Sequence, residues 1–525
     1  MKPTHVALFS ALGMMFTSLS VYSLAPSGDR SPEAVAEVTA EPPRVTPETL
    51  SGAAAVVDPS RFTTGSRLML EGRVGHARLP RSARETFLMF EVRSDEPAAK
   101  TQAQANLSLV IDRSGSMKGT RLENAVQAAT TAVSRLNDGD IVSVVTFDTR
   151  TAVVVPPTTV GPDTRGRILA SVRGISLGGD TCISCGIEEG LALLAQASAG
   201  VSRMLVLSDG DANHGIRDVP GFRAMAQRAR DRGVSITTIG VDVDYNEKIL
   251  SAIALDSNGR HYFVEDDAAL ARIFEAEAEQ LTSSVASGAE LAIDLAPGVE
   301  LDRVFDRSFR RAGGQVVVPL GAFTAGEVKT VLLKVHVDGL GGGAGGPGGD
   351  PRGAAPIADV HLVYRDLIAR TDARCEGKLG AFVAERDGEA SELDALVAGR
   401  VQRSETAATL KQANFLFEQG RLDEARSRLD AQQRSLRAAA DKAKGSAPAA
   451  RAKDVERDFE SQIAALESAN TDFAAPPSFA TPPAASGASA GGFARPAAAP
   501  PAPAKSREGK SAVRRNEVQA FDLAR

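Results

Sequence analysis

The chain has 525 residues, too many for one compact domain, so two or three domains with linkers are expected. Aromatic residues make up 5% of it and tryptophan is absent, so its core must consist mainly of Val, Leu, Ile and Ala. The formal charge of −6 gives no reason to expect nucleic-acid binding, and the six histidines are not spaced like metal ligands.

The N-terminus, residues 1–25, has the pattern of an export segment. Lys2 precedes an apolar run over residues 6–25, and no acidic residue occurs before Asp29. This pattern predicts a signal peptide or a single membrane anchor, with a buried helix as the plainer alternative. Either export interpretation places the protein in the periplasm, at the cell surface or on a membrane. Residues 26–60, rich in Pro, Glu and Ala, predict a disordered linker.

Residues 104–286 alternate between strand and helix patterns. Strands are predicted at 106–111, 141–147, 204–208, 234–241 and 261–264, and helices at 120–136, 163–173, 183–197, 218–232, 246–255 and 268–286. The apolar run 152–155 follows a strand too closely for a crossover, so it is predicted to pair antiparallel at the sheet edge. The alternation indicates an α/β fold with a doubly wound, Rossmann-like parallel sheet.

The regions that flank this domain have other patterns. They predict an N-terminal β element at 61–103, a β-sandwich-like domain at 287–375 with a Gly-rich insertion at 341–356, a helical hairpin region at 376–443, and a mainly disordered Ala/Pro-rich tail at 444–525 with one possible helix near 453–470. Residues 410–425 resemble one tetratricopeptide-type hairpin. A plain helical hairpin is the preferred interpretation, because a single repeat cannot form a stack.

Oxygen-bearing side chains follow two predicted strands and precede one predicted helix. Asp112, Ser114 and Ser116 come directly after the first strand, and Asp209 follows the strand 204–208. Thr181 stands just before the helix at 183. Strand ends and helix starts lie on the same edge of a parallel sheet, where ligands bind. Carboxylates and hydroxyls together make an all-oxygen ligand set that suits a hard cation such as Mg²⁺.

At these positions the sequence resembles bacterial exported proteins with a von Willebrand factor type A (VWA) domain, over about residues 104–286. Asp112-x-Ser114-x-Ser116, Thr181 and Asp209 are similar, in order, to that family's metal-ion-dependent adhesion site (MIDAS). The resemblance implies a divalent cation, usually Mg²⁺, with Mn²⁺ or Ca²⁺ as substitutes. In that pattern the three hydroxyls bind the cation, the two aspartates often act through water, and one coordination position is left for an acidic group of a protein partner.

Three neighbouring aspartates have plainer interpretations. Asp148 is expected to end an edge strand and Asp180 to cap the helix at 183. Asp211 is expected to solvate a turn, with ordering of the Asp209 loop as the alternative. The plain alternative for the main cluster is that Asp112 ends a strand while the serines cap the next helix.

Cys182 and Cys185 form a CxxC directly after Thr181, and Cys375 is the third cysteine. In an oxidising compartment the first two can form a disulfide that stiffens the loop. Two free thiols, a pairing with Cys375, and redox catalysis remain open alternatives.

The leading hypothesis is a non-enzymatic, metal-dependent protein-binding module at the cell envelope. The alternatives are an envelope scaffold or assembly protein, and a VWA subunit that assists an ATPase- or chelatase-type complex, although no Walker A motif occurs. A hydrolase with Ser114 or Ser116 as nucleophile is disfavoured, because neither of these serines lies in a GxSxG or an SxxK motif.

Overall fold

The structure is a computed structural model, and its described part leaves out several segments. It describes residues 58–80, 85–95, 103–197, 200–265, 268–338, 353–384, 386–474 and 503–525. The predicted export segment 1–25, nearly all of the linker 26–60 and most of the Gly-rich insertion therefore lie outside the described residues. Within the described ranges, none of the helices combines the length and the apolar character needed to cross a bilayer.

The α/β domain is built on a six-stranded sheet in the order β10-β9-β8-β5-β6-β7. Its strands are β5 Ala105–Asp112, β6 Ile141–Phe147, β7 Thr151–Thr159, β8 Val201–Ser208, β9 Val234–Val241 and β10 His261–Val264. Neighbouring strands are parallel except β6 and β7, which pair antiparallel at the edge. The predicted doubly wound fold and its edge hairpin are confirmed.

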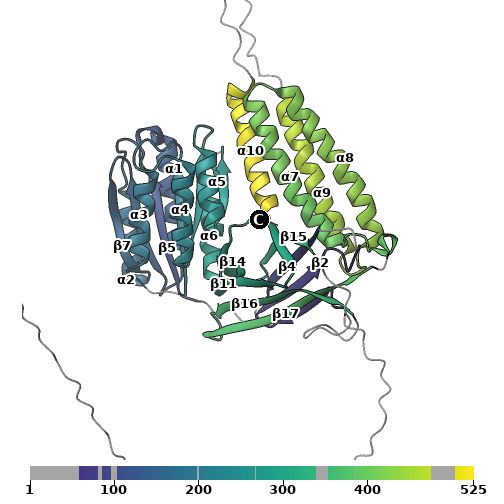
Figure 1. Cartoon of the computed structure of the whole chain (residues 1–525). Helices are drawn as coiled ribbons and strands as arrows, with labels where there is room; N and C mark the ends of the chain where they lie inside the picture. The colour runs from purple at the N-terminus through teal and green to yellow at the C-terminus, as the bar shows by residue number, and fades with distance from the viewer. Residues whose placement is uncertain are drawn as a thin grey trace, which may run out of the picture. The chain divides into compact units, whose positions relative to one another are not determined.

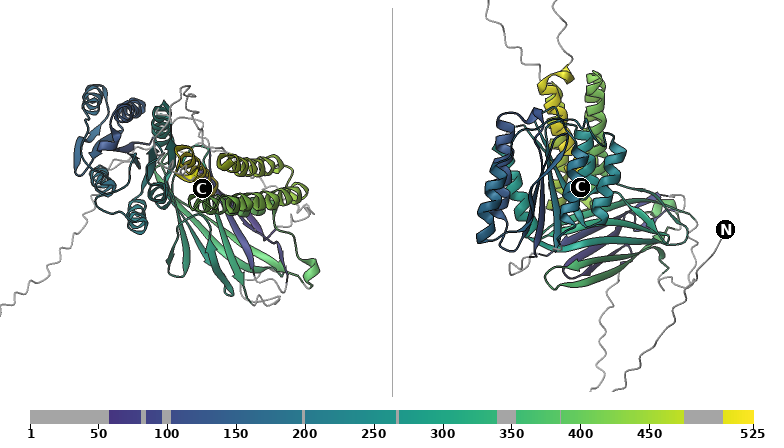
Figure 2. Two further views of the ribbon diagram at one scale, coloured as in Figure 1. Left: turned by 90° about the horizontal axis from the view of Figure 1, so that it is seen from above. Right: turned by 90° about the vertical axis from the view of Figure 1, so that its left-hand side faces the viewer.

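Helices cover both faces of this sheet, as the view from above shows (Figure 2). They are α1 Thr120–Arg135, α2 Pro162–Arg173, α3 Ile183–Leu194, α4 Val219–Asp231, α5 Glu247–Asp256 and α6 Ala268–Thr282, with a short 3-10 turn at Gly115–Met117. Along β5, Leu109 and Ile111 pack with α1 and α6, whereas Val110 packs with α3 and α4 on the other face. Every residue of β5 is buried, as expected of a central parallel strand covered on both sides.

A β-sandwich of two sheets flanks the α/β domain. One sheet has the order β1-β2-β4-β15-β12 and the other β13-β14-β11-β16-β17-β3. Their strands are β1 Arg61–Gly65, β2 Leu68–Val74, β3 Arg78–Leu79, β4 Glu85–Ser94, β11 Ser284–Leu295, β12 Val299–Val304, β13 Arg310–Ala312, β14 Gln315–Thr324, β15 Val328–Val337, β16 Ala355–Asp366 and β17 Thr371–Val383.

The sandwich corrects two predicted boundaries. The element at 61–103 is not separate, because β4 pairs antiparallel with β15 along its length. The α/β domain is therefore inserted between strands of one sandwich. The sandwich also extends past residue 375, since β17 pairs with β16 as far as Ala381 and with β3 at Phe382 and Val383. The first error arises because strand pairing over long sequence distances leaves no local pattern.

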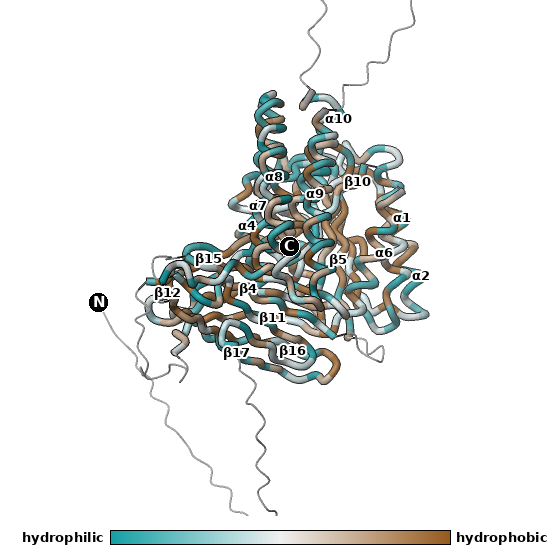
Figure 3. Tube along the Cα trace, turned by 90° about the vertical axis from the view of Figure 1, so that its right-hand side faces the viewer, coloured by the Kyte–Doolittle hydropathy of each residue, from teal (hydrophilic) through white to brown (hydrophobic). Residues whose placement is uncertain are grey.

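Four long helices follow the sandwich (Figure 1). They are α7 Ala395–Glu418, α8 Leu422–Ser446, α9 Ala452–Ala474 and α10 Arg507–Ala524, with short 3-10 turns at Asp387–Glu389 and Pro503–Lys505. Gly420 has φ of +76° between α7 and α8, the left-handed conformation that commonly ends a helix. These helices share an apolar core, whereas the strong brown of the hydropathy view lies along the sheet strands around β5 (Figure 3).

The prediction that 444–525 is mainly disordered is wrong for its described part. The helix expected near 453–470 is present as α9, and α10 is a further helix that was not predicted. α10 buries Ala512, Val513 and Leu523 in the core that it shares with α7 and α9. Its sequence is short and polar on average, so only these tertiary partners reveal it as a packed element.

Candidate functional site

The three predicted loops meet at the carboxyl edge of the central sheet. β5 and β8 are parallel neighbours, with Ile111 opposite Leu207, so the segments that follow them start side by side. Asp112 ends β5, Asp209 follows β8, and Thr181 lies two residues before α3. Parallel pairing of adjacent strands thus places residues almost 100 positions apart in one cluster.

Four of the five predicted residues take part in one set of hydrogen bonds, which also includes Ser208. The Ser114 and Ser116 hydroxyl oxygens lie 3.0 Å apart, and the Ser116 hydroxyl donates to Asp209 Oδ1 at 2.6 Å. Asp112 accepts from the Ser114 backbone N–H at 2.8 Å through Oδ1 and from the Ser208 hydroxyl at 2.6 Å through Oδ2. The two serines and two aspartates are therefore brought together.

Thr181 faces the same space from the third loop. A Cβ placed on Gly210 would lie 3.6 Å from Ser116 Oγ and 3.7 Å from Thr181 Oγ1. The two hydroxyls thus border the same small space beside Gly210. The structure therefore assembles all five predicted residues around one small space.

Most of this cluster is buried, but one side is open. Asp112 is 0% exposed, Ser114 2%, Thr181 4% and Asp209 2%, while Ser116 is exposed. Burial raises the pKa of Asp112 to about 6, against the opposing hydrogen bonds from Ser114 and Ser208. Burial also raises the pKa of Asp209 despite its contacts with Ser116 and Arg121. Two buried carboxylates at one place need positive charge nearby to remain ionised.

The donor set fits a hard divalent cation. It consists of three hydroxyls and two carboxylates, which are oxygen ligands of the kind that Mg²⁺ prefers. In the described ranges, no group of three or more His, Cys, Asp or Glu side chains is arranged to hold a metal. The hydroxyls of Ser114 and Ser116 hydrogen-bond to each other, and that of Ser116 also to Asp209. The oxygen lone pairs of these groups are available to coordinate a cation in place of the hydrogen bonds.

Arg121 is a residue of this site that the sequence did not reveal. It projects from α1, and its Nη1 donates to Asp209 Oδ2 and to the Ser116 carbonyl, both at 2.9 Å. Its Nη2 donates to Asp242, which follows β9. The guanidinium supplies part of the charge that Asp209 needs. The only local signal is a basic residue in the first turn of a helix that follows a DxSxS motif.

The loop that carries Thr181 is fixed by several backbone contacts. The Thr181 N–H donates to Asn213 Oδ1 at 2.8 Å, and the Cys182 N–H to the Asp148 carbonyl at 2.9 Å. Cys182 and Cys185 are joined by a disulfide within the first turn of α3, while Cys375 is a free, buried cysteine. These contacts of Thr181 and of the next residue fix the backbone that carries the Thr181 hydroxyl.

The three neighbouring aspartates differ in what they do. Asp148 pairs with Arg113 at 2.8 Å. Burial opposes ionisation of Asp148, but the Arg150 N–H and the Arg113 guanidinium outweigh it and lower its pKa. Asp180 pairs with His214 at 3.2 Å rather than capping α3, and Asp211 is exposed.

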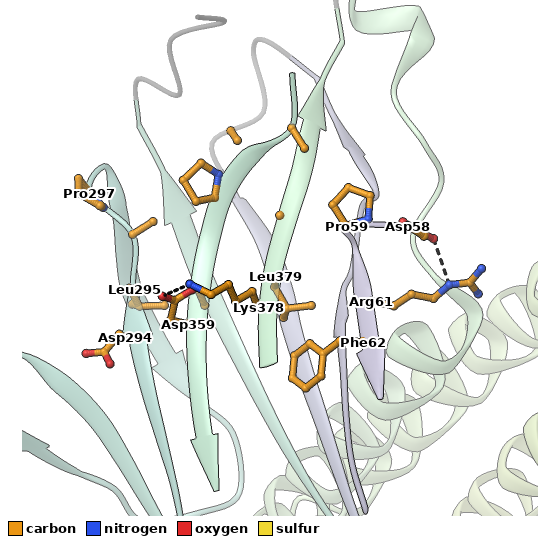
Figure 4. A pocket seen from close by; sticks show the side chains of 16 residues that line it. Asp58, Pro59, Arg61, Phe62, Asp294, Leu295, Pro297, Asp359, Lys378 and Leu379 are labelled. Carbon is orange, nitrogen blue, oxygen red and sulfur yellow. Dashed lines mark hydrogen bonds and ion pairs between the residues drawn. The ribbon is translucent and has the colours of Figure 1, made fainter. Parts of the chain in front are cut away.

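A cavity of about 650 Å³ lies elsewhere, among strand ends of the sandwich (Figure 4). Its charged side chains are already paired. Lys378 contacts Asp359 at 3.0 Å, and Arg61 contacts Asp58 at 3.1 Å. Asp294, the fifth charged residue of its lining, accepts from Gln315 at 2.7 Å. The cavity shares no residue with the cluster around Asp112, so the sheet edge remains the better candidate site.

Comparisons with known proteins support the fold, and the two sequence relatives described below are uncharacterized. Residues 106–276 match the family model described as von Willebrand factor type A domain. The uncharacterized protein sll0103 of Synechocystis sp. is 26% identical over 284 residues, which cover 52% of this chain and 66% of that protein. The uncharacterized protein YfbK of Escherichia coli is 25% identical over 222 residues, which cover 42% of this chain and 38% of that protein.

A solved structure extends the likeness beyond the α/β domain. The von Willebrand factor type A protein from Catenulispora acidiphila superposes with a TM-score of 0.61 at 19% identity, covering 78% of this chain and 92% of that one. At this identity the likeness concerns the fold alone. The matched segments span less than two thirds of the length of each of the two uncharacterized relatives.

Proposed function

We propose that the VWA domain of this chain is a non-enzymatic protein-binding module that depends on a divalent cation, Mg²⁺ or in its place Mn²⁺ or Ca²⁺. Its MIDAS grips an acidic residue of a partner protein. One observation carries the proposal: four almost fully buried oxygen-bearing residues surround a space that is open at the exposed Ser116. A buried anionic cluster with a single exposed hydroxyl is suited to hold a cation and present it to a second molecule.

Each residue of the cluster has a distinct part in this proposal. The hydroxyls of Ser114, Ser116 and Thr181 would hold the cation, and Asp112 and Asp209 would supply the negative charge. When bound, the cation supplies an electrophilic coordination position that a partner carboxylate can occupy. The Ser208 hydroxyl and the Ser114 N–H orient Asp112, and Arg121 orients Asp209.

The contacts of the two serines support binding rather than catalysis. Serine nucleophiles are activated by an adjacent general base, most often a histidine. Among the described residues, the hydrogen bonds of the Ser114 and Ser116 hydroxyls go to each other and to Asp209, and none goes to a histidine. His214, which follows Asp209 by five positions, contacts Asp180 instead.

Export is part of the same proposal. The apolar run at residues 6–25 is the feature that supports a periplasmic, cell-surface or membrane-anchored location. The Cys182–Cys185 disulfide agrees with an oxidising compartment, where such bonds persist.

Calorimetric titration of the full chain with MgCl₂ and MnCl₂ tests the metal site. The wild type is expected to give a saturable heat. Asp112→Ala is expected to give none, because it removes the charge at the centre of the cluster. Since that change also leaves the Ser208 hydroxyl and the Ser114 N–H without their acceptor, Ser116→Ala serves as a second variant. Its side chain is exposed, and its removal takes one hydrogen-bond donor from Asp209 while Arg121 stays in place. This variant is expected to weaken Mn²⁺ binding about tenfold or more.

Asp211→Ala is the matched control, since it removes an exposed carboxylate two residues from Asp209. It is expected to bind Mn²⁺ like the wild type. Absence of heat with the wild type would end the metal-dependent proposal. Equal binding by the wild type and Ser116→Ala would remove the MIDAS assignment.

A further inference from the structure

Helix α10 contacts the VWA domain through ion pairs in which α10 supplies the basic residue and the VWA domain the acidic one. Four basic residues of α10 each contact an acidic residue of the VWA domain or of the segment after β10: Arg507 with Asp242 at 2.8 Å, Lys510 with Asp244 at 2.7 Å, Arg514 with Glu247 at 2.5 Å and Arg515 with Glu265 at 3.3 Å. The base is always on α10. Near its other end, Phe521 packs edge-on against His261 of β10, with ring centres 6.0 Å apart. α10 therefore docks on the VWA domain as a basic helix on an acidic surface.

The same helix is also fixed to the rest of the chain. Arg400 of α7 donates to the carbonyls of Leu523 and Ala524 at 2.8 and 2.7 Å. Arg307 donates to the Arg525 carbonyl at 2.8 Å. These donors satisfy carbonyls that a helix end leaves without partners. α10 thus contacts both the VWA domain and the helical bundle.

One of the four ion pairs leads to the metal site. Asp242 contacts Arg507 through Oδ1 and Arg121 through Oδ2, and Arg121 contacts Asp209 through its other nitrogen. Arg507, Asp242, Arg121 and Asp209 therefore form a chain of alternating charge, which we call the charge chain. Burial opposes ionisation of Asp242, but the Val243 N–H and the guanidinium groups of Arg507 and Arg121 outweigh it and lower its pKa.

Two groups in the charge chain are each shared by two partners of opposite charge. Asp209 and Asp242 share the single guanidinium of Arg121, and Arg121 and Arg507 share the single carboxylate of Asp242. A cation at Asp209 would repel Arg121 and would neutralise the carboxylate that Arg121 neutralises now. Arg121 would then keep its contacts with Asp242 and with the Ser116 carbonyl, and it would compete more strongly with Arg507 for the Asp242 carboxylate.

We propose that the charge chain couples the metal site to α10, so that cation binding and docking of the first turn of α10 oppose each other. Coupling of this kind is reciprocal: if the cation weakens the Arg507 contact, the Arg507 contact weakens cation binding by the same factor. Arg121 acts here as a positioning residue, because it pairs with both Asp209 and Asp242 and so links the electrostatics of the two carboxylates. The inference rests on the proposed metal-dependent function and adds a regulation of that same site.

Titration of the full chain with MnCl₂ tests the coupling. Arg507→Ala is expected to tighten Mn²⁺ binding about fivefold, at the low end of measured coupling between sites. Lys510→Ala is the matched control, because it removes the same charge one turn along α10 from a pair outside the charge chain. At physiological salt it is expected to change the affinity less than about twofold, since screening weakens exposed pairs.

A double-mutant cycle separates the charge chain from a general effect of charge. In an Arg121→Ala background, Arg507→Ala is expected to have no further effect, because the link between Asp242 and Asp209 is missing. Hydrogen exchange gives an independent readout. Saturating Mn²⁺ is expected to speed exchange of the amides in the first turn of α10 in the wild type, and to have no effect on them in Asp112→Ala.

The outcomes distinguish this inference from the proposed function. A wild-type titration without heat removes both. A wild-type heat that Arg507→Ala leaves unchanged, or an equal effect of Arg507→Ala and Lys510→Ala, removes the coupling and leaves the metal site standing. Persistence of the Arg507→Ala effect in the Arg121→Ala background also overturns it.

Discussion

Gly178 lies against the carboxylate of Asp148 so closely that a Cβ on Gly178 would fall 1.9 Å from Asp148 Oδ2. The Gly178 N–H donates to the Arg113 carbonyl at 2.7 Å, and the next residue accepts from the Gly115 N–H at 2.9 Å. The loop that ends at Thr181 is therefore attached to the loop that carries Ser114 and Ser116. This attachment requires a residue without a side chain at position 178.

Gly178→Ala is expected to lower the free energy of unfolding by about 1–3 kcal/mol, because the added methyl must displace Asp148 or the backbone. It is also expected to weaken Mn²⁺ binding, since the shift moves Thr181. Urea unfolding and calorimetry measure the two effects. Gly166→Ala is the control, because a Cβ at this position of α2 meets nothing within 4 Å. Equal stability of the two variants would contradict the packing argument.

His261 gives the fold a specific acid sensitivity. It is buried between Thr238 and Tyr245, with Phe521 of α10 against its ring. Burial, together with the positive charges of Arg514 and Lys411, lowers the pKa of His261 from 6.5 to about 3. The unfolded chain therefore binds a proton near pH 6.5 that the folded chain does not bind until about pH 3, and stability falls as the pH drops through this window.

The wild type is accordingly expected to lose stability relative to His261→Gln on acidification. The difference in unfolding free energy between the two is expected to change by about 3 kcal/mol between about pH 7 and pH 4. Urea unfolding of both proteins across this range measures it, and the comparison cancels the titration of the carboxyl groups that they share. If the unfolding free energies of the two proteins changed in parallel with pH, His261 would have the same pKa in the folded and the unfolded chain.

The Cys182–Cys185 disulfide predicts a simple labelling result. Alkylation of the unfolded, unreduced protein is expected to modify Cys375 alone, because it is the free cysteine. Labelling after reduction is expected to modify all three. Reduction is also expected to weaken Mn²⁺ binding, because the bond lies in the turn that follows Thr181. Three labelled cysteines before reduction would show that the loop is not cross-linked.

The sequence alone was sufficient for the α/β domain and for grouping Asp112 with Asp209 at one edge of its sheet. Apolar runs separated by helical periods predict parallel strands, and parallel strands place their carboxyl ends on one edge. For that reason Asp112 and Asp209 could be assigned to one cluster before their contacts were known. The segments β5 and β8 are fully or largely buried, so their patterns are strong.

Only the tertiary structure decided what surrounds that site. Arg121 and Asp242 are 121 positions apart, and Arg507 lies 265 positions beyond Asp242, so no local period connects them. The pairing of β4 with β15 and the packing of α10 depend in the same way on distant partners. Local patterns report which face of an element is apolar, whereas ion pairs and strand pairing between distant segments are determined by which surfaces the complete fold brings together.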